Sequence, residues 1–143
     1  MNFESFPLTQ AQRRILERTD LAGNLCAVFR LEGRPDERRL AAAVRQVVDR
    51  CPPFSYRYVR VEGQTRILAS PDHPEGLVVL DAPAERSELF ALIEGFRRRG
   101  FRLDGGPPYL FCYLRGQGVA HLVLVCHPAL IDQSSLRPLF TAL

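Results

Sequence analysis

The chain has 143 residues, of which 46% are hydrophobic and 24% are charged. This composition is that of an ordinary globular protein and excludes disordered, collagen-like and low-complexity classes. No apolar run approaches the ~20 residues needed to span a bilayer, and residues 1–12 lack the basic start and apolar core of a secretory signal. We therefore expect a single folded unit over residues 1–143, located in the cytoplasm and not in a membrane.

The charge pattern argues against nucleic-acid binding. All 19 basic residues are arginines, and with 16 acidic residues they give a net charge of +3. This excess is small, and the arginines are spread over expected helices with acids beside them, without interleaved aromatic residues. We expect no nucleic-acid partner.

The cysteines and histidines do not predict a metal site or a disulfide framework. The four cysteines are far apart and match no zinc pattern, so we expect reduced thiols; they are Cys26, Cys51, Cys112 and Cys126. The three histidines share no ligand spacing with an acid or a cysteine. Phosphate-loop and dinucleotide motifs are also missing from the sequence, so we expect no bound metal or cofactor.

The first part of the chain predicts alternating helices and strands. Residues 9–12 form a capping-box pattern, which predicts a short helix to about Arg18. Residues 24–31 are apolar and β-prone and predict a strand. Asp36 opens a second amphipathic helix. The proline pair at 52–53 ends this helix because proline lacks the amide donor that a helix requires.

The rest of the chain predicts a sheet flanked by helices. Two continuous apolar runs, 109–114 and 121–126, are typical of central strands covered on both faces. A last helix is expected from Ser134 or Ser135. The other expected elements are strands at 54–59, 65–69 and 77–80, a hairpin turn at 62–63 and a helix at 83–99. This order predicts an α/β (α+β) sandwich with a mixed or mostly antiparallel sheet.

The segment after the last strand carries the candidate chemistry. Residues 127–135 leave a buried strand and enter the last expected helix, and they include His127 and Asp132. A histidine and an aspartate in such a place are costly to bury unless they are used or paired.

Four stretches resemble a known family. Residues 8–16 resemble the motif S-x-A-Q-x-R-L-W, and residues 50–58 resemble R-H-E-x-L-R-T-x-F. Residues 101–107 are similar to F-D-L followed by G-P, and residues 127–135 lie where the motif H-H-x-x-x-D-G-W-S is expected. In this order they resemble the N-terminal lobe of a condensation domain of nonribosomal peptide synthetases, in the chloramphenicol-acetyltransferase-like superfamily. The resemblance covers nearly the whole chain and implies that superfamily's fold.

The resemblance also implies which residues matter. In the family, the second His of H-H-x-x-x-D-G helps an acceptor amine attack a donor thioester, and both substrates are carried on phosphopantetheine arms. The aligned residue here is Pro128, while His127 and Asp132 retain the first His and the Asp. Gln133 and Ser134 replace the Gly and the Trp.

The family Asp is structural and is held by an Arg that aligns here with Ser55. Arg57 lies two residues further on, and residues two apart on a strand share a face. We therefore hypothesise that Arg57 pairs with Asp132.

Two alignments of the histidine motif remain open. The gapless alignment makes His127 the first His, which then orders the loop. The rival alignment takes Cys126 and His127 as the histidine pair and makes His127 catalytic, at the cost of one inserted residue before Asp132. Of the other histidines, His121 is expected at a core or edge position of a strand, and His73 in a loop.

The resemblance leads to two functional hypotheses. The first is a truncated, degenerate condensation-domain lobe that is inactive alone and binds a carrier protein or an adjacent synthetase domain. The second is an active condensation or acyltransferase half-site that uses His127 and is completed by a second lobe or by self-association. A lone lobe would expose the face on which the second lobe packs, and exposed apolar faces bind partners. Homodimerisation through that face is part of the expectation.

Overall fold

The computed structural model describes residues 5–7, 9, 10, 12, 14, 24–69, 76–98 and 108–129. Two expected features lie outside these residues, namely the end of the first helix and the whole of the last helix from Ser134 or Ser135. The start of the first helix is described. The amide of Thr9 donates to Oε1 of Gln12 over 2.9 Å, and the amide of Gln12 donates to Oγ1 of Thr9 over 3.1 Å. The predicted capping box is therefore confirmed.

The described strands form two sheets. The larger has the order β2-β7-β6-β5, in which β5 and β6 are parallel and the other neighbours are antiparallel. Its strands are β2 (Leu25–Glu32), β5 (Leu77–Asp81), β6 (Tyr109–Arg115) and β7 (Val119–Cys126). The smaller sheet has the antiparallel order β1-β4-β3, and its strands are β1 (Ser5–Pro7), β3 (Tyr56–Val61) and β4 (Gln64–Ala69). The mixed sheet was predicted, whereas β1 was not.

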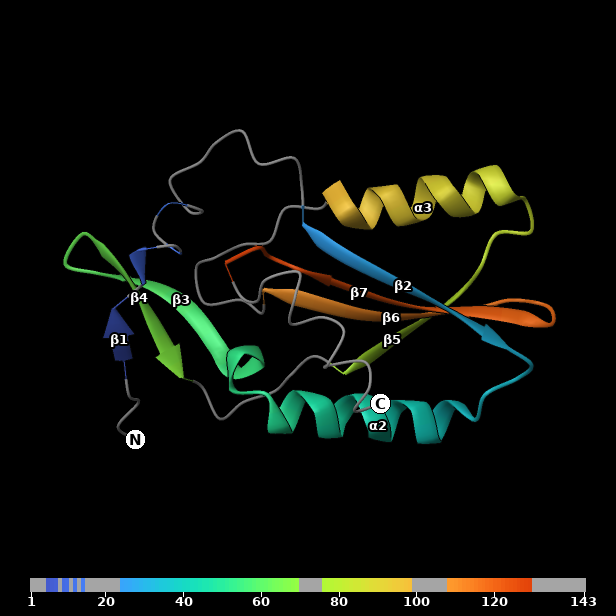
Figure 1. The fold of residues 1–143 in the computed structure, drawn as a ribbon, viewed down its shortest axis with the longest axis horizontal. Helices are drawn as coiled ribbons and strands as arrows, with labels where there is room; N and C mark the ends of the chain where they lie inside the picture. Colours follow the sequence, from blue (N-terminus) through green and yellow to red (C-terminus); the bar gives the residue numbers. More distant parts are fainter. Residues whose placement is uncertain are drawn as a thin grey trace.

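Helix α2 (Glu37–Arg50) covers one face of the larger sheet (Figure 1). It begins at Asp36, whose carboxylate accepts hydrogen bonds from the amides of Arg38 and Arg39 and so satisfies two free donors of the first turn. Its apolar side chains lie at helical spacing and pack into a buried cluster between the helix and the sheet. The cluster consists of Val44, Val47, Val48, Phe54, Tyr109, Phe111, Leu124 and Cys126.

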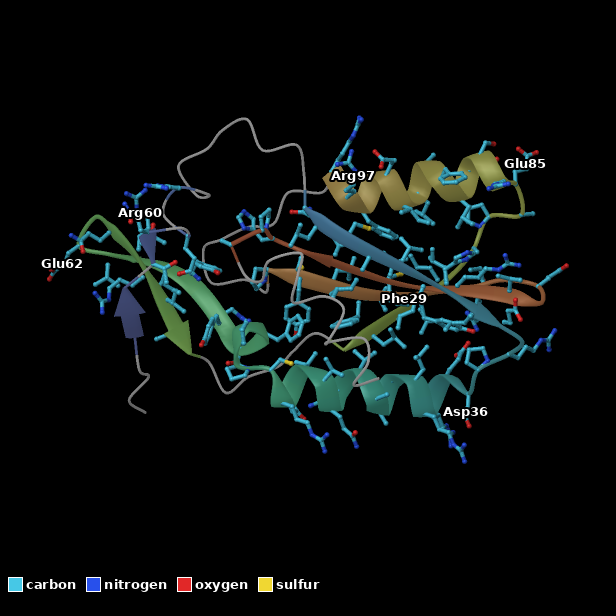
Figure 2. The ribbon with its side chains drawn as sticks, viewed as in Figure 1. Phe29, Asp36, Arg60, Glu62, Glu85 and Arg97 are labelled. Atoms are coloured by element: carbon cyan, nitrogen blue, oxygen red, sulfur yellow. The ribbon has the colours of Figure 1, made fainter. Side chains whose placement is uncertain are left out.

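Helix α3 (Arg86–Arg98) covers the opposite face (Figure 1). It begins three residues after the predicted start at Pro83. The cluster beneath it contains Leu110, Cys112, Leu114, Val123 and Val125, against which Leu89, Leu92, Ile93 and Phe96 pack. None of the residues of α3 itself is fully buried. Arg97, at the end of this helix (Figure 2), pairs with Glu94 over 2.8 Å.

The expected strand at 54–59 is wrong at its start. Residues Pro52–Ser55 form a short 3₁₀ helix, η1, and β3 begins only at Tyr56. The two prolines fix their φ angles in the helical range, and the Ser55 hydroxyl donates to the Pro52 carbonyl over 2.7 Å. The predicted hairpin turn is confirmed: Glu62 and Gly63 have φ angles of 52° and 79°. Figure 2 shows Glu62 at the outer tip of this hairpin.

The two apolar runs are the central strands β6 and β7, as predicted. Helix α2 covers one face of these strands and helix α3 covers the other. Cys112 and Cys126 have no exposed surface. All four cysteines are free thiols. In the part of the chain that the structure describes, neither helix has the length and apolar character needed to cross a bilayer.

Candidate functional site

The candidate site is the turn that leaves the end of β7, residues 127–129. Its first residue is tied to the segment before β6, because the amide of His127 donates to the carbonyl of Pro108 over 2.8 Å. Pro108 directly follows the stretch at 101–107 that resembles the F-D-L…G-P motif. This bond joins the turn after β7 to the residue that precedes β6.

Two further motif regions meet at the carbonyl of Ala129. The hydroxyl of Tyr58, on β3, donates to this oxygen over 3.1 Å, and Nε2 of Gln12 donates to it over 3.2 Å. Tyr58 has no exposed surface, and burial raises the pKa of its hydroxyl to about 12. The hydroxyl is therefore a permanent donor at ordinary pH. Gln12 and Tyr58, from two stretches that resemble family motifs, thus bond to the turn that begins a third.

His127 is half-buried, and its imidazole folds back onto the main chain. The amide of Ala129 donates to Nδ1 of His127 over 3.1 Å. Burial lowers the pKa of His127 below its ordinary value, which favours the neutral ring. Nε2 makes no hydrogen bond to any described residue.

Pro128 lies between His127 and Ala129, and the gapless alignment predicts that it takes the position of the family's second His. Its ring fixes φ near −65°, and it has neither an ionisable group nor an amide proton. The residue therefore shapes the turn and cannot exchange a proton.

Arg57 is the one buried charged residue of the described chain, with 5% of its surface exposed. Its Nη1 donates to the carbonyls of Phe54 and Tyr56 over 3.0 and 2.8 Å. The expectation that Arg57 and Ser55 share a face of one strand is wrong, because Ser55 lies in η1 and β3 begins at Tyr56. Asp132, Gln133 and Ser134 lie outside the described residues, so the pairing stays a prediction.

The other histidines are remote from this turn or are not described. His121 lies on β7, opposite Arg30 of β2, and its buried Nδ1 has no hydrogen-bond partner among the described residues. Burial, followed by the charge of Arg30, lowers the pKa of His121. A cleft of about 610 Å³ lies beside it, between the β5–α3 connection and the β6–β7 turn. His73 lies outside the described residues.

The sequence matches the family model of the condensation domain over residues 3–143. The chain belongs to the condensation-domain family. A curated relative, chondramide synthase cmdD from Chondromyces crocatus, is 29% identical in an alignment of 141 residues, and the match covers 91% of this chain and 4% of that synthase.

Solved structures share the fold. The starter condensation domain of the rhizomide synthetase RzmA matches with a TM-score of 0.79 at 18% identity, over 97% of this chain and 36% of that one. The tallysomycin biosynthesis protein TlmII matches with a TM-score of 0.81 at 22% identity, over 96% of this chain and 37% of that one. This condensation-domain chain therefore spans little more than a third of either protein. The predicted chloramphenicol-acetyltransferase-like lobe is confirmed as the fold.

Sequence reasoning found the turn but missed the side chains that hold it. Tyr58 aligns with the Phe of the R-T-x-F motif, and that motif predicts no role for its hydroxyl. The signal was present, because a tyrosine in place of a phenylalanine adds a hydroxyl that must find a partner when buried. Gln12 was recognised only as a capping residue.

Proposed function

We propose that this condensation-domain lobe acts by binding within a peptide synthetase and does not itself join two thioesters. The proposal rests on the gapless alignment, in which Pro128 takes the position of the family's second histidine. General acid–base catalysis needs a group that exchanges a proton near neutral pH, and proline has none. Positioning of both substrates is a further large part of such catalysis.

The partner we propose is a carrier protein, with its phosphopantetheine arm, or a neighbouring domain of the synthetase. This part of the proposal rests on family membership alone. The chain spans only 36% of the RzmA condensation domain and 4% of the chondramide synthase, so the partners of those whole proteins are not shown for it. Self-association through an open face of the lobe is the other binding mode that we propose.

The alternative is an active acyltransferase half-site that uses His127 and is completed by a second lobe or by self-association. One observation favours it: Nε2 of His127 has no hydrogen-bond partner among the described residues. The same geometry counts against a base at this atom. A basic Nε2 would require the proton to sit on Nδ1, and Nδ1 already accepts the Ala129 amide proton over 3.1 Å.

The deciding experiment combines binding with turnover. The whole chain is titrated with a carrier protein in its phosphopantetheinylated and unmodified forms, and amide formation between two loaded carriers is followed by mass spectrometry. We expect preferential binding of the phosphopantetheinylated carrier and no amide product. Amide formation that is lost in His127→Ala would overturn the proposal in favour of the active half-site.

Pro128→His is the matched gain-of-function variant, because it restores an imidazole at the family's position. A product formed only by this variant would support the missing imidazole as the cause of inactivity. Sedimentation of the wild-type chain gives the oligomeric state in the same buffer.

A further inference from the structure

A second site lies at the opposite end of β7 from the candidate turn. The β6–β7 turn and the start of α3 lie at the same end of the larger sheet (Figure 1), and the cleft of about 610 Å³ lies beside them. We propose that this cleft binds a short zwitterionic peptide, whose amino terminus contacts Asp81 and whose carboxylate contacts His121 and Arg30. The proposal goes beyond carrier binding and does not depend on it.

The cleft has the size and the lining of a ligand site. Its volume of about 610 Å³ lies within the range of about 300–1,000 Å³ that small-molecule sites occupy. Half of its lining residues are apolar and would cover the aliphatic parts of a peptide. These residues are Ala82, Pro83, Ala84, Leu89 and Val119.

Asp81 gives the cleft a negative end. Its Oδ1 pairs with Nε of Arg115 over 3.1 Å, and Nη1 of the same arginine lies 3.6 Å from Oε1 of Glu37. One guanidinium is therefore shared by two carboxylates, and a negative charge remains. The Asp81 side chain is 83% exposed, so it can accept a hydrogen bond from the ammonium group of a ligand.

His121 and Arg30 give the cleft its other, electropositive end. Arg30 lies opposite His121 across the β2–β7 pair, and it makes no ion pair with a described residue. The buried Nδ1 of His121 has no acceptor, so the neutral ring favours a proton on Nε2. Nε2 makes no hydrogen bond to a described residue, and His121 lines the cleft. This N–H can therefore donate to a carboxylate.

The strand order sets the distance between the two ends. Asp81 lies on β5 and His121 on β7, with β6 between them. Neighbouring strands are about 4.8 Å apart, so about 10 Å separate the two positions. An extended chain advances about 3.3–3.6 Å per residue, so a tripeptide spans this distance and a single amino acid does not.

The first test titrates the whole chain with trialanine, up to about 10 mM, and follows its backbone amides by nuclear magnetic resonance. We expect saturable shifts at residues 115–121. The affinity should fall about threefold in Asp81→Asn and in Arg30→Met, because exposed ion pairs are individually weak. Glu62→Gln and Arg60→Met, on the hairpin at the far end of the molecule (Figure 2), are the matched controls and should bind as the wild type does. The absence of saturable shifts at the cleft would overturn the proposal.

The second test uses modified peptides to assign the two ends. N-acetyl-trialanine lacks the ammonium group, so it should bind about threefold more weakly than trialanine and should be insensitive to Asp81→Asn. Trialanine amide lacks the carboxylate, so it should be insensitive to Arg30→Met and should move the nitrogen-15 resonance of His121 Nε2 less than trialanine does. Modified peptides that bind like trialanine would overturn the assignment of a zwitterionic ligand. If the chain binds trialanine but no carrier protein, the proposed function fails and this site stands.

Discussion

The hydroxyl of Tyr58 donates to the carbonyl of Ala129 across 71 positions of the chain. This bond joins the smaller sheet to the turn that follows β7, and it is completely buried on the Tyr58 side. It is the point at which the two sheets of the lobe fix the candidate site. Its contribution to stability can be measured.

Removing this hydroxyl should destabilise the protein modestly. In Tyr58→Phe the Ala129 carbonyl keeps its bond from Gln12, so we expect a loss of about 1 kcal/mol in the free energy of unfolding. Urea denaturation measures the change. Tyr113→Phe removes a hydroxyl that makes no hydrogen bond to a described residue, and it should cost less. Equal losses in the two variants would contradict the role assigned to the bond.

The pairing of Arg57 with Asp132 predicts strong coupling between the two positions. Arg57 has 5% of its surface exposed, and a buried guanidinium requires a counter-charge. In a double-mutant cycle with Arg57→Met and Asp132→Asn, we expect a coupling energy of about 1–3 kcal/mol. The exposed Arg60, in Arg60→Met with Asp132→Asn, is the matched control and should show none. Additive effects of Arg57→Met and Asp132→Asn would remove the hypothesis.

Stability should fall in mild acid because of two histidines. The pKa of His127 is lowered by burial, and that of His121 by burial and then by Arg30, from an ordinary value of 6.5. The unfolded chain therefore binds protons first as the pH falls. The contribution of these rings is fully present above about pH 6.5 and is lost as the pH falls from there through the folded-state values.

Denaturation curves recorded at about pH 7.5, 6.5 and 5.5 test this dependence. The variant His121→Phe with His127→Gln should have a flatter profile over the same range. A wild-type free energy of unfolding that does not change over this pH range would contradict the lowered pKa values of His121 and His127. Glu94, whose pKa is lowered first by its hydrogen bond to Arg97, contributes only in stronger acid.

The aromatic cluster under α2 should be the most sensitive part of the core. The ring of Phe54 is completely buried, and its centroid lies 4.8 Å from that of Tyr109 and 5.7 Å from that of Phe111. We expect Phe54→Ala to cost about 3–5 kcal/mol of unfolding free energy. Phe90, with 58% of its surface exposed, is the matched control, and Phe90→Ala should cost well under half of this. Similar losses of unfolding free energy in Phe54→Ala and Phe90→Ala would contradict the placement of Phe54 in the core.

The thiols should differ in reactivity. Burial raises the pKa of Cys126 to about 12 and that of Cys112 to about 11, and both side chains are inaccessible. In the native protein at about pH 8, we expect a disulfide reagent to modify Cys26 and Cys51 first. Cys112 and Cys126 should react only on unfolding. Rapid modification of all four under native conditions would show that the central strands open.

The sequence alone was sufficient for most of the local elements and for the family. The capping box at Thr9 and Gln12, the cap at Asp36 and the turn at Glu62 and Gly63 depend on neighbouring residues, and each occurs as predicted. The continuous apolar runs of β6 and β7 also predicted their burial between two helices. The order of motifs along the chain identified the condensation-domain family.

Only the tertiary structure decided how the site is held. The hydrogen bonds that join the turn to Tyr58, Gln12 and Pro108 connect residues that are far apart in the sequence. No local sequence pattern specifies such contacts. The 3₁₀ turn before β3 likewise replaced the predicted strand start, because the two prolines outweighed the alternating pattern. The gapless alignment of the sequence predicts a proline where the family has a histidine. The folded chain decided that the remaining imidazole turns back to its own main chain, since that depends on where Ala129 is held in space.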